Sequence, residues 1–242
     1  MKTIYLLCGL LSDDVVWKAQ ADALARQDDA YDVRIVSFTN GEDTMAAMAE
    51  RVLASAAESA PARFALAGHS MGGRVALEVM RRAPERVERL ALLDTGFEAA
   101  LPAETEKRGA LVDQARREGI ASIAAAWGLP MLAPARRGDP VLVRQVFDMV
   151  GRMSPDIYAA QTRALLTRPD ATEVLRSLAC PTLILCGRQD GWSPPERHAR
   201  MADLLPQPPL LRFIDDCGHM SMMEQPDAVL AAMRAWLEEG AR

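Results

Sequence analysis

Residues 64–80 read FALAGHSMGGRVALEVM, and this stretch decides how the chain folds. An apolar run opens it, a helical pattern begins at Met71, and Ser70 lies between the two with Gly68 and Gly72 on either side. A serine exposed on so tight a strand-to-helix turn adopts a strained backbone, and small neighbours keep the adjoining chain from clashing. The turn either contains a hydroxyl by chance or holds a nucleophile in the G-x-S-x-G pattern. The strand before it and the helix after it favour the nucleophile.

Short apolar runs alternate with longer helical patterns over most of the chain. The runs expected to form strands are 4–7, 33–36, 64–67, 90–93, 182–185 and 210–214. The patterns expected to form helices are 15–26, 43–57, 71–82, 195–205 and 226–239. Most of the runs are continuously apolar, which is typical of parallel strands covered on both faces. The alternation predicts an α/β fold with a mostly parallel, doubly covered sheet of about six strands.

Residues 97–176 interrupt this alternation. They contain helical stretches broken by glycine and proline, and no convincing strand. We therefore predict that 97–176 form a helical cap, inserted after the strand that ends at Asp94. The core of the fold then consists of residues 1–96 and 177–242.

Apolar side chains near the expected site have two alternative roles. Trp127, Met131 and Phe147 of the cap are candidates for lining a substrate pocket, although such residues at helical spacing more often pack their own helices. Packing is the favoured role for each of them, and some are expected to do both. Trp192 is expected to cover its own loop rather than border the pocket.

Composition excludes several classes of function. With 242 residues the chain is long enough for one domain with a large core. The net charge is −5 and no Lys/Arg stripe occurs, so nucleic acid is not an expected partner. No apolar run reaches the roughly 18–20 residues that span a membrane. The apolar start predicts a buried strand rather than a signal peptide, because no small-residue cleavage site follows it.

The cysteines indicate a reduced, cytoplasmic protein. All four lie apart in the sequence, mostly in or beside apolar runs, and none forms a CxxC pair. This pattern argues against a disulfide framework and against a zinc site. Both a monomer and a homodimer fit the pattern of apolar residues.

A serine nucleophile needs a base, and the chain contains three histidines. His69 adjoins the serine but is expected to point to the other side of the turn, in a structural role. His198 lies in a polar helical segment and is expected to be a solvated surface residue. His219 follows the last predicted strand, and the loops at the carboxyl ends of parallel strands are where functional residues collect. His219 is therefore the predicted base.

The base needs a carboxylate that orients it and stabilises its charged form. Asp190 lies directly after a buried strand, in the stretch PTLILCGRQDGWSPP (181–195). Asp94 is the alternative because it also ends a strand, whereas Asp215 and Asp216 precede the predicted base too closely to reach behind it. Asp190 is preferred.

Attack on a carbonyl creates an oxyanion, which needs hydrogen-bond donors. The N–H of Met71, the residue after the nucleophile, is one predicted donor. The second is expected from the loop after the first strand, where Gly9 permits a close approach. Leu10 N–H is preferred there, and Leu11 N–H is the alternative. Arg74, further along the helix, is expected to point away from the site.

These motifs together resemble the α/β-hydrolase superfamily over nearly the whole chain. The stretches that carry the resemblance are LLCGLLSD, LAGHSMGGRVALEVMRRAPERVERLALLD, PTLILCGRQDGWSPP and CGHMSMMEQPDAVLAAMRAWL. Within the superfamily the chain is similar to the small capped serine hydrolases, a group that includes the pimeloyl-acyl-carrier methyl ester carboxylesterase and SHCHC synthase. The resemblance implies a catalytic triad of Ser70, Asp190 and His219 under a helical cap. The chain departs from the pattern at Cys8-Gly9, where His-Gly is usual, and its sheet begins at the third strand of larger relatives.

The resemblance also implies acyl transfer. Haloalkane dehalogenases and most epoxide hydrolases of this superfamily have an aspartate nucleophile at the position of Ser70, so a serine there argues against their chemistry. The expected function is a carboxylesterase-like hydrolase for an ester or thioester of a small to medium acyl substrate. It would work through an acyl-enzyme, with no metal and no cofactor. One alternative is a cofactor-free C–C hydrolase or lyase that uses the same triad. The other, outside the enzymes, is a ligand receptor or signalling module with slow turnover.

Overall fold

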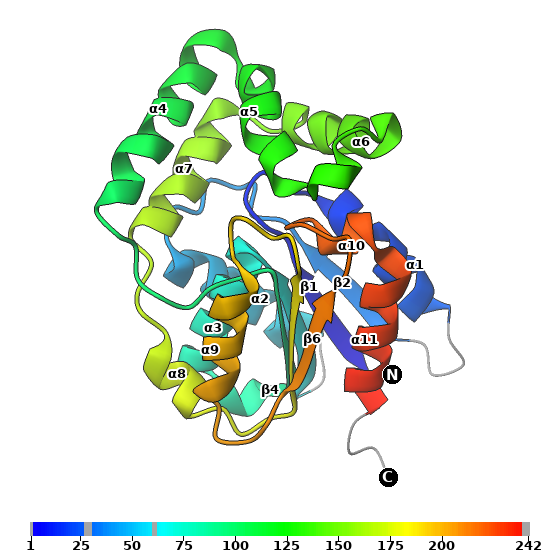
Figure 1. Ribbon diagram of the computed structural model, residues 1–242. Helices are drawn as coiled ribbons and strands as arrows, with labels where there is room; N and C mark the ends of the chain where they lie inside the picture. The colour runs from blue at the N-terminus through cyan, green and yellow to red at the C-terminus, as the bar shows by residue number, and fades with distance from the viewer. Residues whose placement is uncertain (1, 27–30, 60–61, 239–242) are drawn as a thin grey trace.

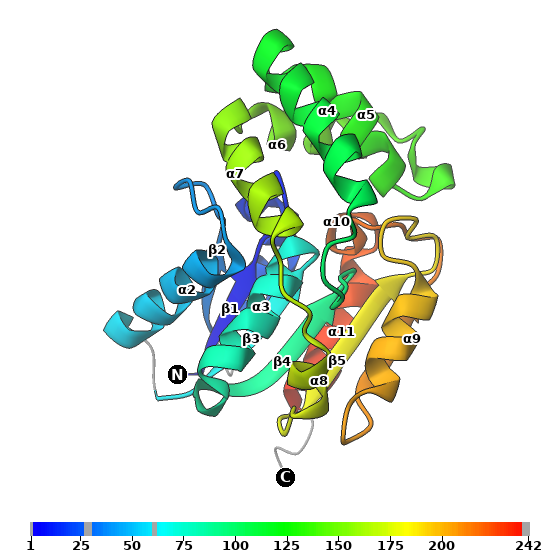
Figure 2. The ribbon, with the colours of Figure 1, turned by 90° about the vertical axis from the view of Figure 1, so that its left-hand side faces the viewer.

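The computed structural model describes residues 2–26, 31–59 and 62–238. Within these residues the chain forms a six-stranded sheet in the order β2-β1-β3-β4-β5-β6, and every neighbouring pair is parallel (Figures 1 and 2). The strands are β1 (Thr3–Leu7), β2 (Asp32–Val36), β3 (Phe64–His69), β4 (Val87–Leu93), β5 (Thr182–Gly187) and β6 (Leu210–Ile214). The predicted α/β fold and its six strands are confirmed.

Helices cover both faces of the sheet (Figure 2). The helices of one face are α1 (Lys18–Ala25), which follows a short 3₁₀ turn, and α11 (Pro226–Glu238). The helices of the other face are α2 (Met45–Ser59), α3 (Met71–Arg82) and α9 (Pro195–Asp203). Two covered faces explain why the strands read as continuous apolar runs. The last residue of the C-terminal helix predicted from the sequence, Glu239, lies outside the described residues.

The central strands end level with one another at one edge of the sheet. In the parallel register, Leu7 of β1 pairs with Gly68 of β3, Gly68 with Leu92 of β4, and Leu92 with Ile184 of β5. β1, β3 and β5 are buried along their whole length, whereas β2 and β6 at the two sides are largely only partly buried. The loops that leave the carboxyl ends of these strands therefore meet at one place, as in other open α/β sheets.

The chain between β4 and β5 is helical. Its α-helices are α4 (Ala103–Glu118), α5 (Ala124–Gly128), α6 (Pro140–Gly151), α7 (Pro155–Leu166) and α8 (Thr172–Arg176). Asp139 and Ser154 cap the N-termini of α6 and α7, each followed by a proline at the first helical position, where a missing N–H costs nothing. α4 to α7 lie above the carboxyl edge of the sheet, while α8 packs against α3 at the other end (Figure 1).

Two buried tryptophans anchor the helices of one face to the sheet. Trp17 Nε1 donates to Leu7 O at 3.1 Å, and Trp236 Nε1 donates to Pro181 O at 3.2 Å. Each ring removes a large apolar surface from water while its N–H keeps a partner, so neither burial leaves a polar group unsatisfied.

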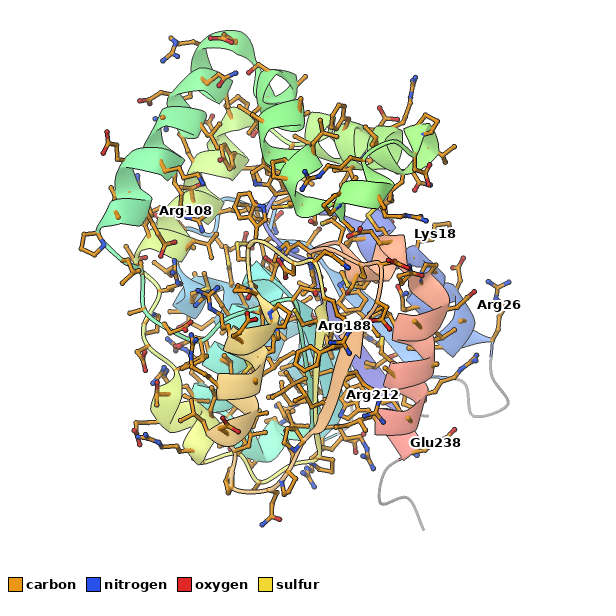
Figure 3. All side chains as sticks on the ribbon, in the orientation of Figure 1. Lys18, Arg26, Arg108, Arg188, Arg212 and Glu238 are labelled. Atoms are coloured by element: carbon orange, nitrogen blue, oxygen red, sulfur yellow. The ribbon has the colours of Figure 1, made fainter. Side chains whose placement is uncertain are left out.

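Charged side chains lie mainly on the outside of the molecule (Figure 3). The labelled side chains that are exposed are Lys18, Arg26, Arg188, Arg212 and Glu238. Arg108 is the labelled residue that is only partly exposed, between α4 and the edge of the sheet. Among the described helices, none combines the length and the apolar character needed to cross a membrane.

Substitution of Gly72 tests how closely α3 approaches β1. A Cβ at Gly72 would lie 2.4 Å from Leu7 O, a main-chain atom that cannot move away. We expect Gly72→Ala to lower the free energy of unfolding by about 3 kcal/mol. Gly109, inside α4, is the matched control because a Cβ there meets nothing within 4 Å. Gly109→Ala should raise the free energy by about 0.5–1 kcal/mol in the same urea titration. Equal stability of the two variants would contradict this packing.

Candidate active site

Ser70 forms the turn between β3 and α3. Its backbone has φ 53° and ψ −114°, a conformation that costs a non-glycine residue on the order of 1–3 kcal/mol. The turn is held by Ser70 N–H, which donates to Leu93 O at 3.0 Å, and by Thr95 Oγ1, which donates to Ser70 O at 2.6 Å. A Cβ on Gly68 would lie 2.3 Å from Gly72 O, so the chain can cross itself here only without side chains. The hydroxyl is thereby exposed at the end of the sheet.

The structure brings Ser70, His219 and Asp190 together. His219 follows β6 and Asp190 follows β5. Ser70 Oγ–H donates to His219 Nε2 at 2.9 Å, and His219 Nδ1–H donates to Asp190 Oδ2 at 2.8 Å, with the tautomer assigned from the carboxylate, which can only accept. Asp190 Oδ1 accepts the N–H groups of Trp192 and Ser193 at 2.8 and 2.9 Å. The carboxylate is thus fixed by its own loop and the imidazole by the carboxylate.

His219 and Asp190 shift each other's pKa. Burial by itself would lower the pKa of His219, but the nearby carboxylates, Asp190 foremost, outweigh burial and raise it. Burial by itself would raise the pKa of Asp190, but the His219 ring and the two loop N–H groups outweigh burial and lower it. Asp190 is therefore ionised, and the His219 ring is a stronger base than a free imidazole.

Asp94, the alternative acid, makes different contacts. It ends β4 with φ 47°, its Oδ1 accepts Gly187 N–H at 2.9 Å, and Ser221 Oγ–H donates to its Oδ2. Burial, and then the neighbouring Asp190, raise the pKa of Asp94 well above its usual range. Its oxygens are thus engaged by β5 and a serine, while the imidazole bonds to Asp190. The geometry favours Asp190 as the acid.

Asp94, Cys186 and Asp190 form a buried cluster with potential metal ligands within 4.8 Å of one another. All four carboxylate oxygens already accept hydrogen bonds from the protein. Burial, and then the two carboxylates, raise the pKa of Cys186, so the thiol keeps its proton. A metal needs the thiolate and free oxygens, so this donor set does not fit a metal ion.

The other two histidines are buried and neutral. His69 Nε2–H donates to His219 O at 2.8 Å, and burial, together with the His219 ring, lowers the pKa of His69 to about 3. The prediction that His198 is a surface residue is wrong. His198 is fully buried, accepts Thr95 N–H at 3.0 Å, and has a pKa that burial lowers to about 4. α9 is polar in composition, but His198 and Met201, three residues apart, share its inner face.

Two main-chain N–H groups are available beside Ser70. Leu10 and Met71 line the cavity there, and neither N–H has a hydrogen-bond partner within the described residues. Leu11 N–H instead donates to a glutamine side chain of α7 at 2.9 Å. A Cβ on Gly9 would lie 3.3 Å from Ser70 Cβ, so this loop makes the close approach predicted for it. A hydroxyl bonded to an oriented base, next to two free donors, suits attack on a carbonyl group.

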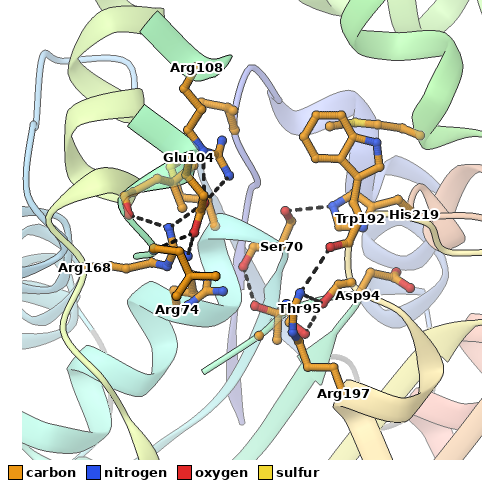
Figure 4. A pocket seen from close by; sticks show the side chains of 17 residues that line it. Ser70, Arg74, Asp94, Thr95, Glu104, Arg108, Arg168, Trp192, Arg197 and His219 are labelled. Atoms are coloured by element: carbon orange, nitrogen blue, oxygen red, sulfur yellow. Dashed lines mark hydrogen bonds and ion pairs between the residues drawn. The ribbon is translucent and has the colours of Figure 1, made fainter. Parts of the chain in front are cut away.

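The cavity at Ser70 has a volume of about 260 Å³ and lies between the sheet edge and the helices above it (Figure 4). Of the three predicted lining residues, Met131 lines this cavity and Trp127 lines a second cavity of about 520 Å³. Phe147 lines neither of the two and is partly buried, packed against the hydrophobic core. Trp192 lines both cavities, so the prediction that it only covers its loop is wrong.

Four arginines line the cavity that contains Ser70, namely Arg74, Arg108, Arg168 and Arg197 (Figure 4). The prediction that Arg74 points away is wrong: it lies in the first turn of α3, directly after Ser70, and lines the same cavity. The other three follow from no local pattern, because only the packing of α4, α9 and the loop after α7 brings them to one place.

Glu224 is a further buried residue that the sequence analysis missed. Its Oε1 accepts the N–H groups of Gly218 and Met220, which flank His219, at 3.0 and 3.2 Å. Its Oε2 accepts Ala133 N–H at 2.8 Å, from the segment between α5 and α6. Burial raises the pKa of Glu224 in spite of these donors. The carboxylate ties the loop of His219 to the helices above the sheet.

Comparison with known proteins agrees with this fold. The sequence profile described as "Alpha/beta hydrolase family" matches residues 4–232. A thermophilic esterase from Thermogutta terrifontis, solved with malate bound, has 32% identity and a TM-score of 0.88, covering 99% of this chain and 90% of its own. The carbamate hydrolase candidate RutD of Rhizobium rhizogenes is 29% identical over 84% of this chain and 80% of its own length. The pimeloyl-[acyl-carrier protein] methyl ester esterase of Aliivibrio fischeri (strain MJ11) is 21% identical over 98% and 94%.

Substitution of Glu224 tests whether this side chain holds the His219 loop. Glu224→Gln leaves one acceptor oxygen for the three N–H groups, so we expect a loss of about 2 kcal/mol in the free energy of unfolding. Faster hydrogen exchange is expected at one or more of Gly218, Met220 and Ala133. The control is Glu58→Gln on the exposed surface of α2, which should change neither quantity. Unchanged exchange in the Glu224 variant would contradict the assigned role.

Proposed function

This chain belongs to the α/β hydrolase family, and on that premise we propose that it cleaves a carboxylic ester or thioester of a small to medium acyl substrate through Ser70, His219 and Asp190. It is an esterase-like hydrolase, as the likeness to the Thermogutta esterase supports. The observation that carries the proposal is the hydrogen-bonded line from Ser70 Oγ through His219 to Asp190, with distances of 2.9 and 2.8 Å. The helices within 97–176 serve as the cap that closes over the substrate.

The first half of the reaction forms an acyl-enzyme. His219 Nε2 takes the proton of Ser70 Oγ as that oxygen attacks the carbonyl carbon, and Asp190 stabilises the resulting imidazolium. The carbonyl oxygen becomes an oxyanion, which accepts the N–H groups of Leu10 and Met71. When the intermediate collapses, the bond to the leaving alcohol or thiol breaks, and His219 returns the proton to it. The acyl group is left as an ester of Ser70.

The second half releases the acid. His219, neutral again, takes a proton from a water molecule that attacks the acyl carbon. The same two N–H groups stabilise the second oxyanion, and the proton returns to Ser70 Oγ as the acyl bond breaks. Burial of His219 and Asp190 keeps bulk water from competing for their hydrogen bond. The substrate is a small molecule, in keeping with a cavity of about 260 Å³.

Loss of the Ser70 hydroxyl tests the acyl-enzyme route. With p-nitrophenyl acetate, butyrate and octanoate, we expect Ser70→Ala to lower kcat at least about 10³-fold. The control is Ser122→Ala, which removes a partly exposed serine of the cap segment, outside the cavity at Ser70, and should keep wild-type kcat. Mass spectrometry should also find one phosphonate adduct, on Ser70, after treatment of the wild type with an activated phosphonate ester. A folded wild type that hydrolyses none of these esters would contradict the proposed function.

The pH profile distinguishes Asp190 from Asp94. Hydrolysis requires neutral His219, so kcat/KM should fall as the pH drops below the pKa of His219, which lies above the ordinary value of about 6.5. Asp190→Asn removes the charge that raises this pKa, so the acid limb should move to lower pH while kcat falls by about 10⁴-fold. Asp94→Asn should move the limb less, because burial already favours the protonated form of Asp94. If the acid limb of the pH profile moved only in Asp94→Asn, Asp94 rather than Asp190 would be the carboxylate that orients His219.

A further inference from the structure

The cavity at Ser70 contains more positive than negative charge. Arg74, Arg108, Arg168 and Arg197 line it, and Glu104 is the lining glutamate (Figure 4). Asp94 is the other acidic residue of the lining, and both of its oxygens already accept hydrogen bonds, from Gly187 N–H and Ser221 Oγ–H. This composition differs from the apolar lining of most small-molecule sites, in which a few polar groups orient the ligand.

Glu104 neutralises two of the arginines. Its Oε1 accepts Arg168 Nη2 at 2.5 Å, and its Oε2 accepts Arg168 Nη1 at 3.1 Å. The same Oε2 accepts Arg108 Nη2 at 3.2 Å. Arg168 also donates to the carbonyl groups of Leu165 and Glu98, so its donors are used within the protein. The carboxylate of Glu104 therefore pairs with both arginines. The donors of Arg168 are all used within the protein, whereas Arg108 keeps N–H groups that no described residue engages and that are free to bind a ligand.

Glu98 neutralises the arginine on the opposite wall. Its Oε2 lies 3.2 Å from Arg197 Nε, and its Oε1 accepts Arg200 Nη2 at 2.8 Å. Arg197 donates further to the carbonyl group of Trp192 at 3.1 Å. Arg197 and Arg200, both in α9, thus share the carboxylate of Glu98, and this carboxylate forms no ion pair with Arg74 of α3.

Arg74 has no carboxylate of its own. Its Nη1 donates to the main-chain carbonyl of Glu98 at 2.8 Å, and no carboxylate lies within ion-pair distance of it among the described residues. Burial, and then the positive charges of Arg168 and Arg197, lower the pKa of Arg74 to about 9. A partly buried cation among other cations is costly, and an incoming anion would relieve that cost. The unpaired group is a guanidinium, whose planar fork matches the two oxygens of a carboxylate.

The position of Arg74 relates this unpaired charge to the reacting group. Ser70 immediately precedes α3, Arg74 lies in the first turn of that helix, and both residues line the same cavity. An anion on the guanidinium therefore lies only a few atoms from a carbonyl group placed at Ser70 Oγ. Arg108 approaches from α4 and is the second arginine with donors to spare. The cavity, at about 260 Å³, is smaller than the roughly 300–1,000 Å³ of drug-sized sites and suits a short substrate.

We propose that the substrate is a short ester that carries a free carboxylate a few atoms from the scissile bond, and that Arg74 binds this carboxylate with help from Arg108. This rests on the proposed ester hydrolysis. Half-esters of short dicarboxylic acids carry the carboxylate on the acyl side, and esters of short hydroxy acids carry it on the alcohol side. Both have the chemistry that the unpaired guanidinium recognises.

The test compares charged esters with neutral esters of the same shape. Monomethyl succinate is paired with methyl 4-methylpentanoate for the acyl side, and O-acetylglycolate is paired with isobutyl acetate for the alcohol side. In the wild type, the anionic member of at least one pair should have a kcat/KM about tenfold higher or more. The pair that shows the preference identifies the side that carries the carboxylate.

Substitution of Arg74 assigns that preference to the guanidinium. Arg74→Gln should lower kcat/KM for the preferred anionic ester about 10- to 100-fold and leave its neutral counterpart within about threefold. Arg74→Lys, which keeps the charge but not the fork, should retain part of the preference. Arg200→Gln is the control, because Arg200 shares Glu98 but lies outside the cavity. An equal loss for the charged and neutral esters would assign Arg74 a purely structural role and overturn the proposal, as would a wild type without preference in either pair.

A binding measurement separates this proposal from the proposed hydrolysis. Succinate is titrated calorimetrically into Ser70→Ala and into the double variant Ser70→Ala/Arg74→Gln. Binding to the first that is lost in the second supports the anion site even where no ester is hydrolysed, in which case the hydrolase function alone fails. Absence of binding to Ser70→Ala, or equal binding to both proteins, overturns the anion site.

Discussion

The strained turn at Ser70 is the constraint on which the rest of the site depends. β1, β3 and α3 cross so closely that a Cβ on Gly72 would meet Leu7 O at 2.4 Å, and one on Gly68 would meet Gly72 O at 2.3 Å. The turn is therefore held between main-chain atoms rather than by adjustable side chains. This explains how the chain sustains φ 53° at a serine, and why the hydroxyl and the first N–H of α3 occupy defined positions at the sheet edge.

The loops around this turn complete the site by hydrogen bonds to the main chain. Asp190 accepts two N–H groups of its own loop before it meets His219, and Glu224 accepts N–H groups on both sides of His219. Glu224 also reaches Ala133 in the helical segment between β4 and β5. His219 N–H also donates to Met131 O of the same segment at 2.7 Å. A displacement of that segment would consequently shift His219. The position of the proposed base is therefore coupled to the helices that cover it.

Charge is distributed unevenly across the site. On the side of His219, burial and hydrogen bonds balance one imidazole against one ionised carboxylate, and burial raises the pKa of Asp94. On the opposite side, Arg74, Arg108 and Arg168 outnumber Glu104, the carboxylate of the lining that faces them, and Arg74 bonds to a carbonyl group alone. The first arrangement suits the proton transfers of acyl transfer, and the second suits recognition of an anion.

Local patterns in the sequence were sufficient for the sheet, the turn at Ser70 and the residues that end strands. Apolar runs reveal strands because both faces are covered, and glycines reveal the turn because only they fit it. Asp190 and His219 could be chosen because parallel strands bring their carboxyl ends to one edge.

Four features could not be predicted from such patterns: the burial of His198, the inward direction of Arg74, the contact of Trp192 with the cavity, and the hydrogen bonds of Glu224 to the His219 loop. The first, second and fourth depend on which face of a helix meets another element, and the role of Trp192 depends on where the loop after β5 packs. The sequence by itself thus determined the fold and the candidate reacting groups, because these follow from periodicity and backbone sterics. Only the tertiary structure decided the charge and shape of the pocket, because those arise from side chains of separate helices that meet after folding.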